Sequence, residues 1–312
     1  MNIVFCADYG VLHALHVAAY SVLNRMDPTS EATQFFIISD KFEQHDIDQL
    51  AETLQKTGKN FQVELVRLDP KVFAGFKPLN GSLAAYYKLV IPELIKVDRY
   101  LYLDTDILCD VDLSPLEGVP MEGVAVAWVS EAPMDKAFDR KVALDLGNNA
   151  DHLYFNSGVL LVNALEWKKQ DVTAKTLDYL THNEALIREQ SALNVVLHQR
   201  TIPIDEKYNS LSNMRKHWPD LIKPLGQIDR LIHFADYPKP WDFLGEVVHP
   251  QFSLWREILN QTAMPDFHSW DSLPSRRIPK TKASWLGYKK GFKDKILFTL
   301  YSKGLFKRVK GI

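Results

Sequence analysis

Two carboxylates separated by one residue, Asp104 and Asp106, are the most informative chemical groups in the sequence. They follow the apolar run Tyr-Leu-Tyr-Leu at residues 100–103, and residues two apart on extended backbone point to the same side. Two carboxylates held together repel each other unless a positive charge lies between them, and a divalent cation is the usual one. The pair is therefore a candidate cation site, although an Asp-x-Asp sequence alone is also typical of ordinary strand ends and turns.

Three further segments carry polar side chains beside apolar runs. Residues 154–163 place an Asn-Ser-Gly turn before an expected strand, and residues 188–194 are expected to open a helix with a Glu-Gln pair. Residues 232–241 place a histidine and a lysine around a proline-rich loop.

The order of these segments resembles glycosyltransferase family 8, in particular its bacterial lipooligosaccharide and lipopolysaccharide α-galactosyl- and α-glucosyltransferases. The matching motifs extend in family order from about residue 3 to residue 241: Phe-x-Ala-Asp, Tyr-Leu-Asp-x-Asp, Phe-Asn-x-Gly-Val-Leu-Leu-x-Asn, an acid-Gln pair and a His-Phe…Lys-Pro-Trp variant. The resemblance implies a GT-A fold, a UDP-hexose donor, a glycan or glycolipid acceptor and retention of the anomeric configuration.

The resemblance also implies Mn²⁺, or another divalent cation, held by Asp104, Asp106 and His233, with UDP oxygens completing the shell. Such a mixed set of oxygen and nitrogen ligands leaves open positions on the cation. The cation then offsets the charge that develops on the departing UDP. A lone histidine is more often an ordinary core or surface group, and His233 is included because Lys239-Pro240-Trp241 matches as well.

The family motifs also imply which residues bind the nucleotide and which bind the sugar. The resemblance implies a nucleotide site made by Ala7, Asp8, Tyr9, Thr105, Asp236 and Lys239, and a sugar site made by Lys88, Asn156 and Gln190. Within it, Lys239 would reach the diphosphate. Asp8 would accept the uracil N3–H, or would be an ordinary carboxylate at a strand end.

Two neighbouring residues are candidates for the catalytic step. Gln190 matches the family position near the β face of the anomeric carbon, and because an amide is a poor nucleophile the resemblance favours front-face attack within an ion-pair-like intermediate. Glu189 is the alternative as a covalent nucleophile, or it is an acid that complements the N-terminus of a helix.

Four positions depart from the family pattern. Lys88 stands where many relatives have arginine, which keeps the charge but loses the bidentate fork. Glu189 replaces an aspartate, Asp236 replaces a glycine, and a sugar-contacting aspartate is displaced, with Ser130 or Glu131 near its place. The choice between galactose and glucose therefore stays open, as does a non-catalytic UDP-sugar-binding or scaffold protein of the same fold. A nucleotidyltransferase is disfavoured because residues 6–13 lack Lys and Arg.

The segments that must position these groups alternate between expected strands and expected helices. Short apolar strands at residues 3–5, 35–38 and 63–66 alternate with helical patterns around residues 15–23 and 47–54. This alternation predicts an α/β fold with a mixed, largely parallel sheet, in which ligands lie beyond the carboxyl ends of strands. We expect a GT-A catalytic domain over residues 1–262 and a basic, aromatic, membrane-associating region over residues 263–312.

Residues 276–312 differ sharply in charge from the rest of the chain. They carry twelve Lys or Arg against one acid and have a net charge of +11, whereas the remainder has −13. Apolar residues at steps of three and four predict an amphipathic helix lying on an anionic membrane, with a stripe made by Trp285, Tyr288, Phe292, Ile296 and Leu300. Three glycines weaken this prediction, and a solvated basic tail is the alternative. Nucleic-acid binding lacks a recognition motif.

The cysteine content and the hydropathy of the sequence predict the cellular compartment of the protein. The two cysteines, Cys6 and Cys109, are too few for a disulfide framework, which favours a reducing environment. The sequence opens without a signal-peptide pattern and has no apolar run of the roughly 18 residues that a membrane span needs. We expect a cytoplasmic protein associated peripherally with the inner face of the plasma membrane.

Overall fold

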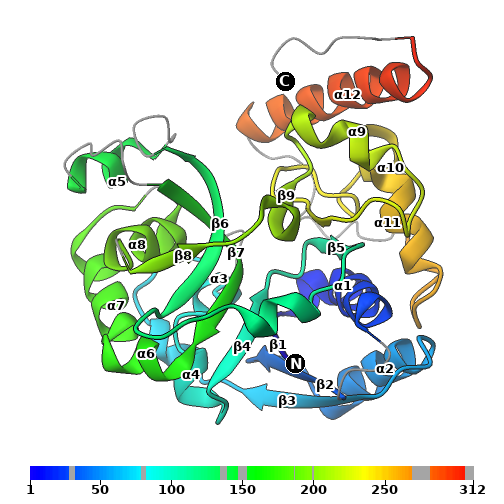
Figure 1. The fold of residues 1–312 in the computed structure, drawn as a ribbon. Coiled ribbons are helices and arrows are strands. Elements are labelled where there is room, and N and C mark those ends of the chain that lie inside the picture. Colours follow the sequence, from blue (N-terminus) through cyan, green and yellow to red (C-terminus); the bar gives the residue numbers. More distant parts are fainter. Residues whose placement is uncertain are drawn as a thin grey trace.

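The computed structural model describes residues 1–27, 32–78, 82–133, 139–146, 153–185, 187–198, 200–268 and 282–305. Within these residues the main sheet has seven strands in the order β3-β2-β1-β4-β7-β6-β8 (Figure 1). Its strands are β1 Asn2–Cys6, β2 Thr33–Ser39, β3 Phe61–Arg67, β4 Arg99–Leu103, β6 Val126–Pro133, β7 Leu153–Asn163 and β8 Thr201–Pro203. Strand β7 is antiparallel to β4 and β6, and the other pairs are parallel. The prediction of a mixed, largely parallel sheet is confirmed.

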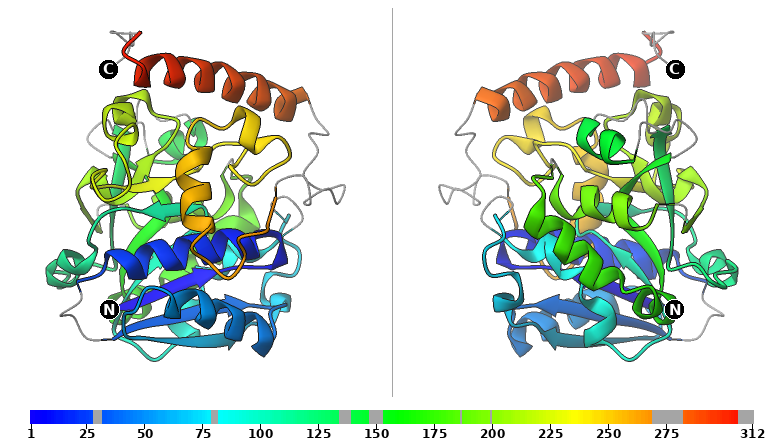
Figure 2. Two further views of the ribbon diagram at one scale, coloured as in Figure 1. Left: turned by 90° about the vertical axis from the view of Figure 1, so that its right-hand side faces the viewer. Right: turned by 90° about the vertical axis from the view of Figure 1, so that its left-hand side faces the viewer.

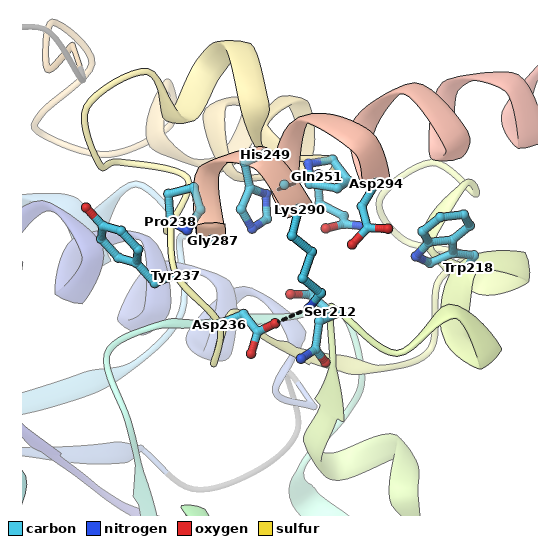
Figure 3. Close-up of a pocket in the computed structure, with 13 residues that line it drawn as sticks. Ser212, Trp218, Asp236, Tyr237, Pro238, His249, Gln251, Gly287, Lys290 and Asp294 are labelled. Carbon is cyan, nitrogen blue, oxygen red and sulfur yellow. Dashed lines mark hydrogen bonds and ion pairs between the residues drawn. The ribbon is translucent and has the colours of Figure 1, made fainter. Parts of the chain in front are cut away.

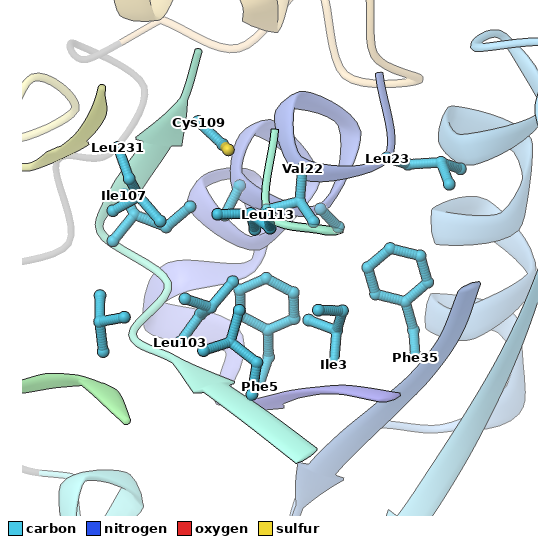
Figure 4. Close-up of a cluster of buried hydrophobic side chains, with 14 of the residues drawn as sticks. Ile3, Phe5, Val22, Leu23, Phe35, Leu103, Ile107, Cys109, Leu113 and Leu231 are labelled. Atoms are coloured by element: carbon cyan, nitrogen blue, oxygen red, sulfur yellow. The ribbon is translucent and has the colours of Figure 1, made fainter. Parts of the chain in front are cut away.

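Helices cover both faces of this sheet, so alternate residues of its central strands are buried on opposite sides. On one face, Ile3 and Phe5 pack with helix α1 (Leu12–Arg25) and helix α2 (Gln44–Gln55) (Figure 4). On the other face Val4 packs against helices that include α3 Ala84–Tyr87, α4 Ile91–Leu94, α6 Ala164–Lys169, α7 Val172–His182 and α8 Arg188–Val196. Each fully buried large side chain contributes roughly 1.5–3 kcal/mol, which is why these strands are apolar on both sides.

A second, smaller sheet carries part of the site. It has the order β5-β10-β9, with β5 at Ile107–Cys109, β10 at Leu231–His233 and β9 at Ser210–Leu211. Because β5 follows β4 after only three residues, the segment 104–106 joins the two sheets. Strand β10 is antiparallel to β5, with His233 opposite Ile107, so the histidine arrives beside the two acids.

Strand β7 is irregular where it passes the site. Its pairing with β6 jumps from Leu160 opposite Trp128 to Phe155 opposite Ser130. The expected Asn-Ser-Gly turn at residues 156–158 was wrong, because these residues lie inside β7 and the backbone stays in the strand. They form a bulge, a feature that re-aims side chains at functional sites.

Helix α12 (Lys282–Ser302) lies across the end of the molecule away from β3 and α2 (Figure 2). Its inner face packs on the body: Tyr288 donates a 2.5 Å hydrogen bond to the Phe243 carbonyl, and the Phe298 ring lies 5.4 Å from that of Trp218. The predicted stripe is therefore split. Tyr288 is only 5% exposed and belongs to the inner face, which corrects its assignment to a membrane-facing stripe. The spacing of apolar residues along a helix does not show which of them face the body and which face solvent.

The segment after the predicted domain boundary at residue 262 also packs on the body. The Phe267 ring stacks on His13 at 3.9 Å, and the Ala263 backbone N–H donates to Thr53 at 2.9 Å. Part of the basic tail (Arg276, Arg277, Lys280, Lys307, Arg308 and Lys310) and the side chain of Glu131 lie outside the described residues.

The remaining helical elements are short. They are η1 Tyr9–Val11, η2 Pro70–Phe73, η3 Ser114–Gly118, α5 Arg140–Asp145, η5 Glu206–Asn209, η6 Arg215–His217, α9 Trp218–Leu221, α10 Gly245–Val248 and α11 Phe252–Leu259. None of the helices in the described part of the chain combines the length and the apolar character that a membrane crossing requires.

Candidate functional site

Asp104, Asp106 and His233 come together as a candidate metal centre. One ligand atom from each lies within 4.8 Å of the other two. His233 Nε2 is 3.2 Å from Asp106 Oδ1 and 3.9 Å from Asp104 Oδ2. Two carboxylates and an imidazole suit a divalent cation that accepts mixed ligands.

The orientation of His233 is set by a chain of amides. Its Nδ1 lies 2.9 Å from Asn209 Oδ1, and an amide oxygen can only accept, so Nδ1 carries a proton and Nε2 faces the acids. Asn209 Nδ2 in turn donates to Asn156 Oδ1 at 3.0 Å, and that oxygen also accepts from the Gly158 N–H. Metal-binding histidines usually have their other ring nitrogen held by such a hydrogen bond.

Gly158 provides the space that the cluster needs. A Cβ at this position would lie 2.3 Å from His233 Cε1 and 2.8 Å from Asp104 Oδ2. The Gly158 carbonyl accepts from the Asp104 N–H at 2.7 Å, so β7 is held against the first acid. Only a residue without a side chain permits this approach.

Lys239 supplies positive charge to the cluster. Its Nζ is 2.6 Å from Asp106 Oδ2 and also donates to the Phe234 carbonyl. Burial raises the pKa of Asp106, but the charges of Lys239 and His233 outweigh burial and bring it well below its usual range. Asp106 is therefore ionised at neutral pH, as a metal ligand must be.

Lys88 links the first acid to the catalytic candidates. It is only 2% exposed, and its Nζ lies 3.2 Å from Asp104 Oδ1, 3.1 Å from the Ser157 carbonyl and 3.7 Å from Glu189 Oε1. Burial lowers the pKa of Lys88, but Asp104 and Glu189 outweigh burial and raise it overall. Burial raises the pKa of Glu189, and Lys88 partly opposes this.

Gln190 is hydrogen-bonded to β7 at its bulge. Its Oε1 accepts from the Ser157 N–H at 3.0 Å and its Nε2 donates to the Tyr154 hydroxyl at 2.9 Å. An amide offers two acceptor and two donor sites, so each end of Gln190 keeps one site for a ligand.

The residues predicted for uracil and ribose lie at the carboxyl end of β1. Ala7 is buried, and its N–H donates to the Ile38 carbonyl. Asp8 Oδ1 accepts from the Gly10 N–H at 2.8 Å, and Tyr9, 47% exposed, donates to Asp46 at 2.9 Å. These polar contacts go to β2, η1 and α2, not to the metal cluster.

Two other predicted nucleotide residues differ in position. Thr105 is buried between the two acids of the candidate metal centre. Asp236 is half-exposed, and its carboxylate accepts from Lys290 of α12 at 2.6 Å. Asp236 therefore brings a paired charge to the loop that carries Lys239, not a free one.

The sequence motifs assigned no role to Asn209, Tyr102 or Gly158. Tyr102 donates from its hydroxyl to Asp104, and its place two residues before that acid on a strand was a usable signal. Asn209 lies 24 residues before His233, and no spacing rule connects the two.

Comparisons with known proteins place the chain in a family. The family model described as glycosyl transferase family 8 matches residues 2–245, a range that contains the metal cluster and ends before α11 and α12. General stress protein A of Bacillus subtilis (strain 168) is 26% identical over 266 residues, covering 80% of this chain and 90% of the relative. A lipopolysaccharide 1,2-glucosyltransferase of Escherichia coli (strain K12) is 24% identical over 317 residues, covering 98% of this chain and 88% of the relative.

The fold is also found among solved structures. The galactosyltransferase LgtC, in complex with donor and acceptor sugar analogs, superposes with a TM-score of 0.68 at 22% identity. The match covers 92% of this chain and all of that one (100%). The predicted GT-A-type α/β fold is confirmed.

Proposed function

The chain belongs to glycosyltransferase family 8, and on this basis we propose that it is a retaining α-glycosyltransferase that moves galactose or glucose from UDP to a glycan. The observation that carries the proposal is the cluster of Asp104, Asp106 and His233 beside Lys239. The name of the Escherichia coli relative supports a lipid-linked acceptor, such as a lipopolysaccharide core or another surface polysaccharide.

We assign the cation site to Asp104, Asp106 and His233, with Mn²⁺ as the expected ion. A bound cation of this kind neutralises negative charge on the UDP leaving group. Asn209 holds the imidazole with its Nε2 toward the acids. Lys239 is assigned to the diphosphate as a second positive group.

We assign the nucleotide to the carboxyl end of β1. Ala7, Asp8 and Tyr9 are proposed to border uracil and ribose, and Thr105 and Asp236 to lie beside the phosphates. Asp236 replaces the glycine expected from the family pattern, and its pairing with Lys290 at 2.6 Å offsets a carboxylate that would repel a diphosphate.

We assign the hexose to Lys88, Asn156 and Gln190, with Gln190 supporting the oxocarbenium-like state through its amide. Gln190→Ala is then expected to slow transfer by about 10–1,000-fold, the range seen when an electrostatic donor is lost. Glu189→Gln is expected to keep most activity, because Glu189 is paired with Lys88 at 3.7 Å and is not the nucleophile in this proposal. Complete loss of turnover in Glu189→Gln, with a trappable glycosyl-enzyme, would instead favour covalent catalysis.

A donor screen tests the activity itself. The full chain is incubated with Mn²⁺ and UDP-Gal, UDP-Glc or UDP-GlcNAc, and hydrolysis or transfer is followed by mass spectrometry. We expect Mn²⁺-dependent turnover of UDP-Gal or UDP-Glc. Binding of UDP-hexose without turnover of any donor would support the non-catalytic alternative.

We further propose that the outer face of α12 binds an anionic membrane at the inner face of the plasma membrane. Trp285, Phe292 and Ile296 are 54%, 51% and 47% exposed on one helical face, and Lys289 and Lys293 are exposed beside them. Aromatic and aliphatic side chains mixed with lysines are typical of interfacial helices.

Co-sedimentation with vesicles tests this face without removing the helix. The double variant Lys289→Glu/Lys293→Glu should lose salt-sensitive binding to anionic vesicles, at about 1 kcal/mol per lysine near the surface. Lys168→Glu/Lys169→Glu on α6 changes the charge equally and should bind as the wild type does. Equal loss in both pairs would show that net charge, and not α12, determines binding.

A further inference from the structure

A pocket lies between the inner face of α12 and the loop that carries Lys239 (Figure 3). Its walls include Ser212, Trp218, Tyr237, Gln251, Lys290 and Asp294, and we call it the α12 pocket. The pocket is distinct from the metal cluster, which contributes no residue to its lining.

The side chain of Gln251 is the unusual feature of this pocket. It is only 1% exposed, and neither Oε1 nor Nε2 has a hydrogen-bond partner among the described residues. The indole N–H of Trp218, also 1% exposed, has none either. Asn213 Oδ1, which also belongs to the lining, lacks a partner as well. A buried polar group without a partner is destabilising, so the α12 pocket has two donor groups and two acceptor oxygens that a ligand can satisfy.

The charged groups around the α12 pocket already neutralise one another. Lys290 pairs with Asp236 at 2.6 Å, and Asp294 pairs with Arg215 at 2.9 Å. The pKa of His249 is lowered to about 3, first by burial and then by Lys239 and Lys295, so this imidazole is neutral. The unsatisfied groups of the lining are therefore those of two amides and an indole N–H, which match hydroxyls better than they match a phosphate or a carboxylate.

The α12 pocket is also close to the proposed transfer site. Asp236 and Tyr237 line it and lie in sequence between His233 and Lys239, and the charge of Lys239 acts on both Asp236 and His249. The ring of Tyr237, 36% exposed, adds an apolar wall. A sugar residue matches this lining, because its ring is uncharged, carries hydroxyl groups at its edges and has apolar faces.

We propose that the α12 pocket is a saccharide subsite that binds an uncharged sugar of the acceptor glycan, away from the sugar that reacts. This inference rests on the proposed function for its acceptor, but its binding step does not require turnover. Helix α12 then has two roles: its inner face closes a sugar subsite, and its outer face is the one proposed to meet lipid.

Saturation-transfer NMR on the full chain with Mn²⁺ and UDP tests the subsite directly. The probes are methyl β-galactoside, methyl α-glucoside and the oligosaccharide released from Escherichia coli lipopolysaccharide, with inorganic phosphate as a separate arm. Gln251→Leu removes both unpartnered atoms at similar volume and should weaken binding of the best saccharide about 10-fold. Trp218→Phe keeps an aromatic ring, loses the N–H and should weaken it about 2–5-fold, which covers the case that Gln251→Leu fails to fold.

Two controls separate this proposal from the proposed function. Gln170→Leu, which also loses an unpartnered amide oxygen but lies at the end of α6, should bind the saccharide as the wild type does. UDP-hexose hydrolysis without acceptor should be unchanged in Gln251→Leu, and its absence in the wild type would count against the proposed function alone. Equal saccharide affinity in wild type and Gln251→Leu, no saccharide binding by the wild type, or binding of phosphate only would overturn the subsite.

Discussion

The metal cluster and the α12 pocket both involve the loop at residues 234–241 but are built in different ways. In the cluster, backbone register brings the groups together: Asp104 and Asp106 flank the junction of β4 with β5, and His233 lies on the strand paired with β5. In the α12 pocket, side chains of a separate helix meet the body, and Gln251 is left without a partner. The cluster is thus organised before a ligand arrives, whereas the α12 pocket leaves polar groups for its ligand to satisfy.

The largest effect should come from filling the space at Gly158. Gly158→Ala would place a Cβ 2.3 Å from His233 Cε1, and a shift of about 1 Å in a catalytic group can cost about 100-fold. We expect at least about a 100-fold loss of Mn²⁺-dependent turnover. Gly118→Ala, where an added Cβ meets nothing within 4 Å, is the matched control. Equal activity in both variants would mean that the cluster tolerates movement of β7.

The next effect concerns the amide behind His233. Asn209→Ala removes the acceptor 2.9 Å from His233 Nδ1, and loss of such a partner typically costs 10–100-fold in metal affinity. Calorimetric titration with Mn²⁺ in the presence of UDP measures this. Asn209→Asp keeps an acceptor and should recover most of the affinity; if it binds as weakly as Asn209→Ala, the ring is not positioned through this bond.

Substitutions on the two faces of α12 should change the free energy of unfolding by unequal amounts. Tyr288→Leu loses the hydrogen bond to Phe243 and the ring contact with Tyr237, and should lower the free energy of unfolding by about 1–2 kcal/mol. Trp285→Leu, at a 54% exposed position, should stay within about 0.5 kcal/mol of wild type. Denaturant unfolding compares the two, and a larger loss in Trp285→Leu would reverse the assignment of the faces.

The smallest effect is a pH dependence shared by both regions. Burial lowers the pKa of His16, under the main sheet, to about 4, and that of His249, beside the α12 pocket, to about 3. Because these folded-state pKa values lie below the ordinary 6.5, the unfolded chain binds protons more readily, and stability falls as the pH drops below 6.5 toward these values. Each histidine should cost about 0.7 kcal/mol between pH 7 and pH 6.

Unfolding titrations of His16→Asn and His249→Asn measure these contributions separately. Each variant should show a shallower loss of stability between pH 7 and pH 5 than the wild type. An unchanged slope in both variants would mean that the two rings are not held neutral in the folded protein.

The same contrast explains what the sequence could predict. Alternating apolar strands and helices predicted the α/β sheet, and the spacing of Asp104 and Asp106 predicted their convergence, because both follow from local backbone periodicity. His233 was identified through a family resemblance rather than through spacing. Asn209 could not be found, because its contact with His233 depends on how two strands of the second sheet are paired.

Two errors have physical causes as well. Asn156–Gly158 contain turn-forming residues, but they lie inside β7, where its pairing with β6 shifts register in a bulge. Tyr288 shares the spacing of the exposed aromatic residues, yet it faces the body, because the glycines at 287 and 291 let α12 approach the loop closely. Tertiary packing determines the backbone at residues 156–158 and the orientation of Tyr288, and the local sequence pattern shows neither.

The central claim is that Asp104, Asp106 and His233 hold a divalent cation for a UDP-sugar. Isothermal titration of Mn²⁺ and UDP into wild type, Asp106→Ala and Asp98→Ala tests it most directly, because Asp98 is an exposed acid just before β4. Cooperative Mn²⁺·UDP binding should be lost in Asp106→Ala and kept in Asp98→Ala, with both variants folded by circular dichroism. Undiminished Mn²⁺·UDP affinity in folded Asp106→Ala would contradict the assignment.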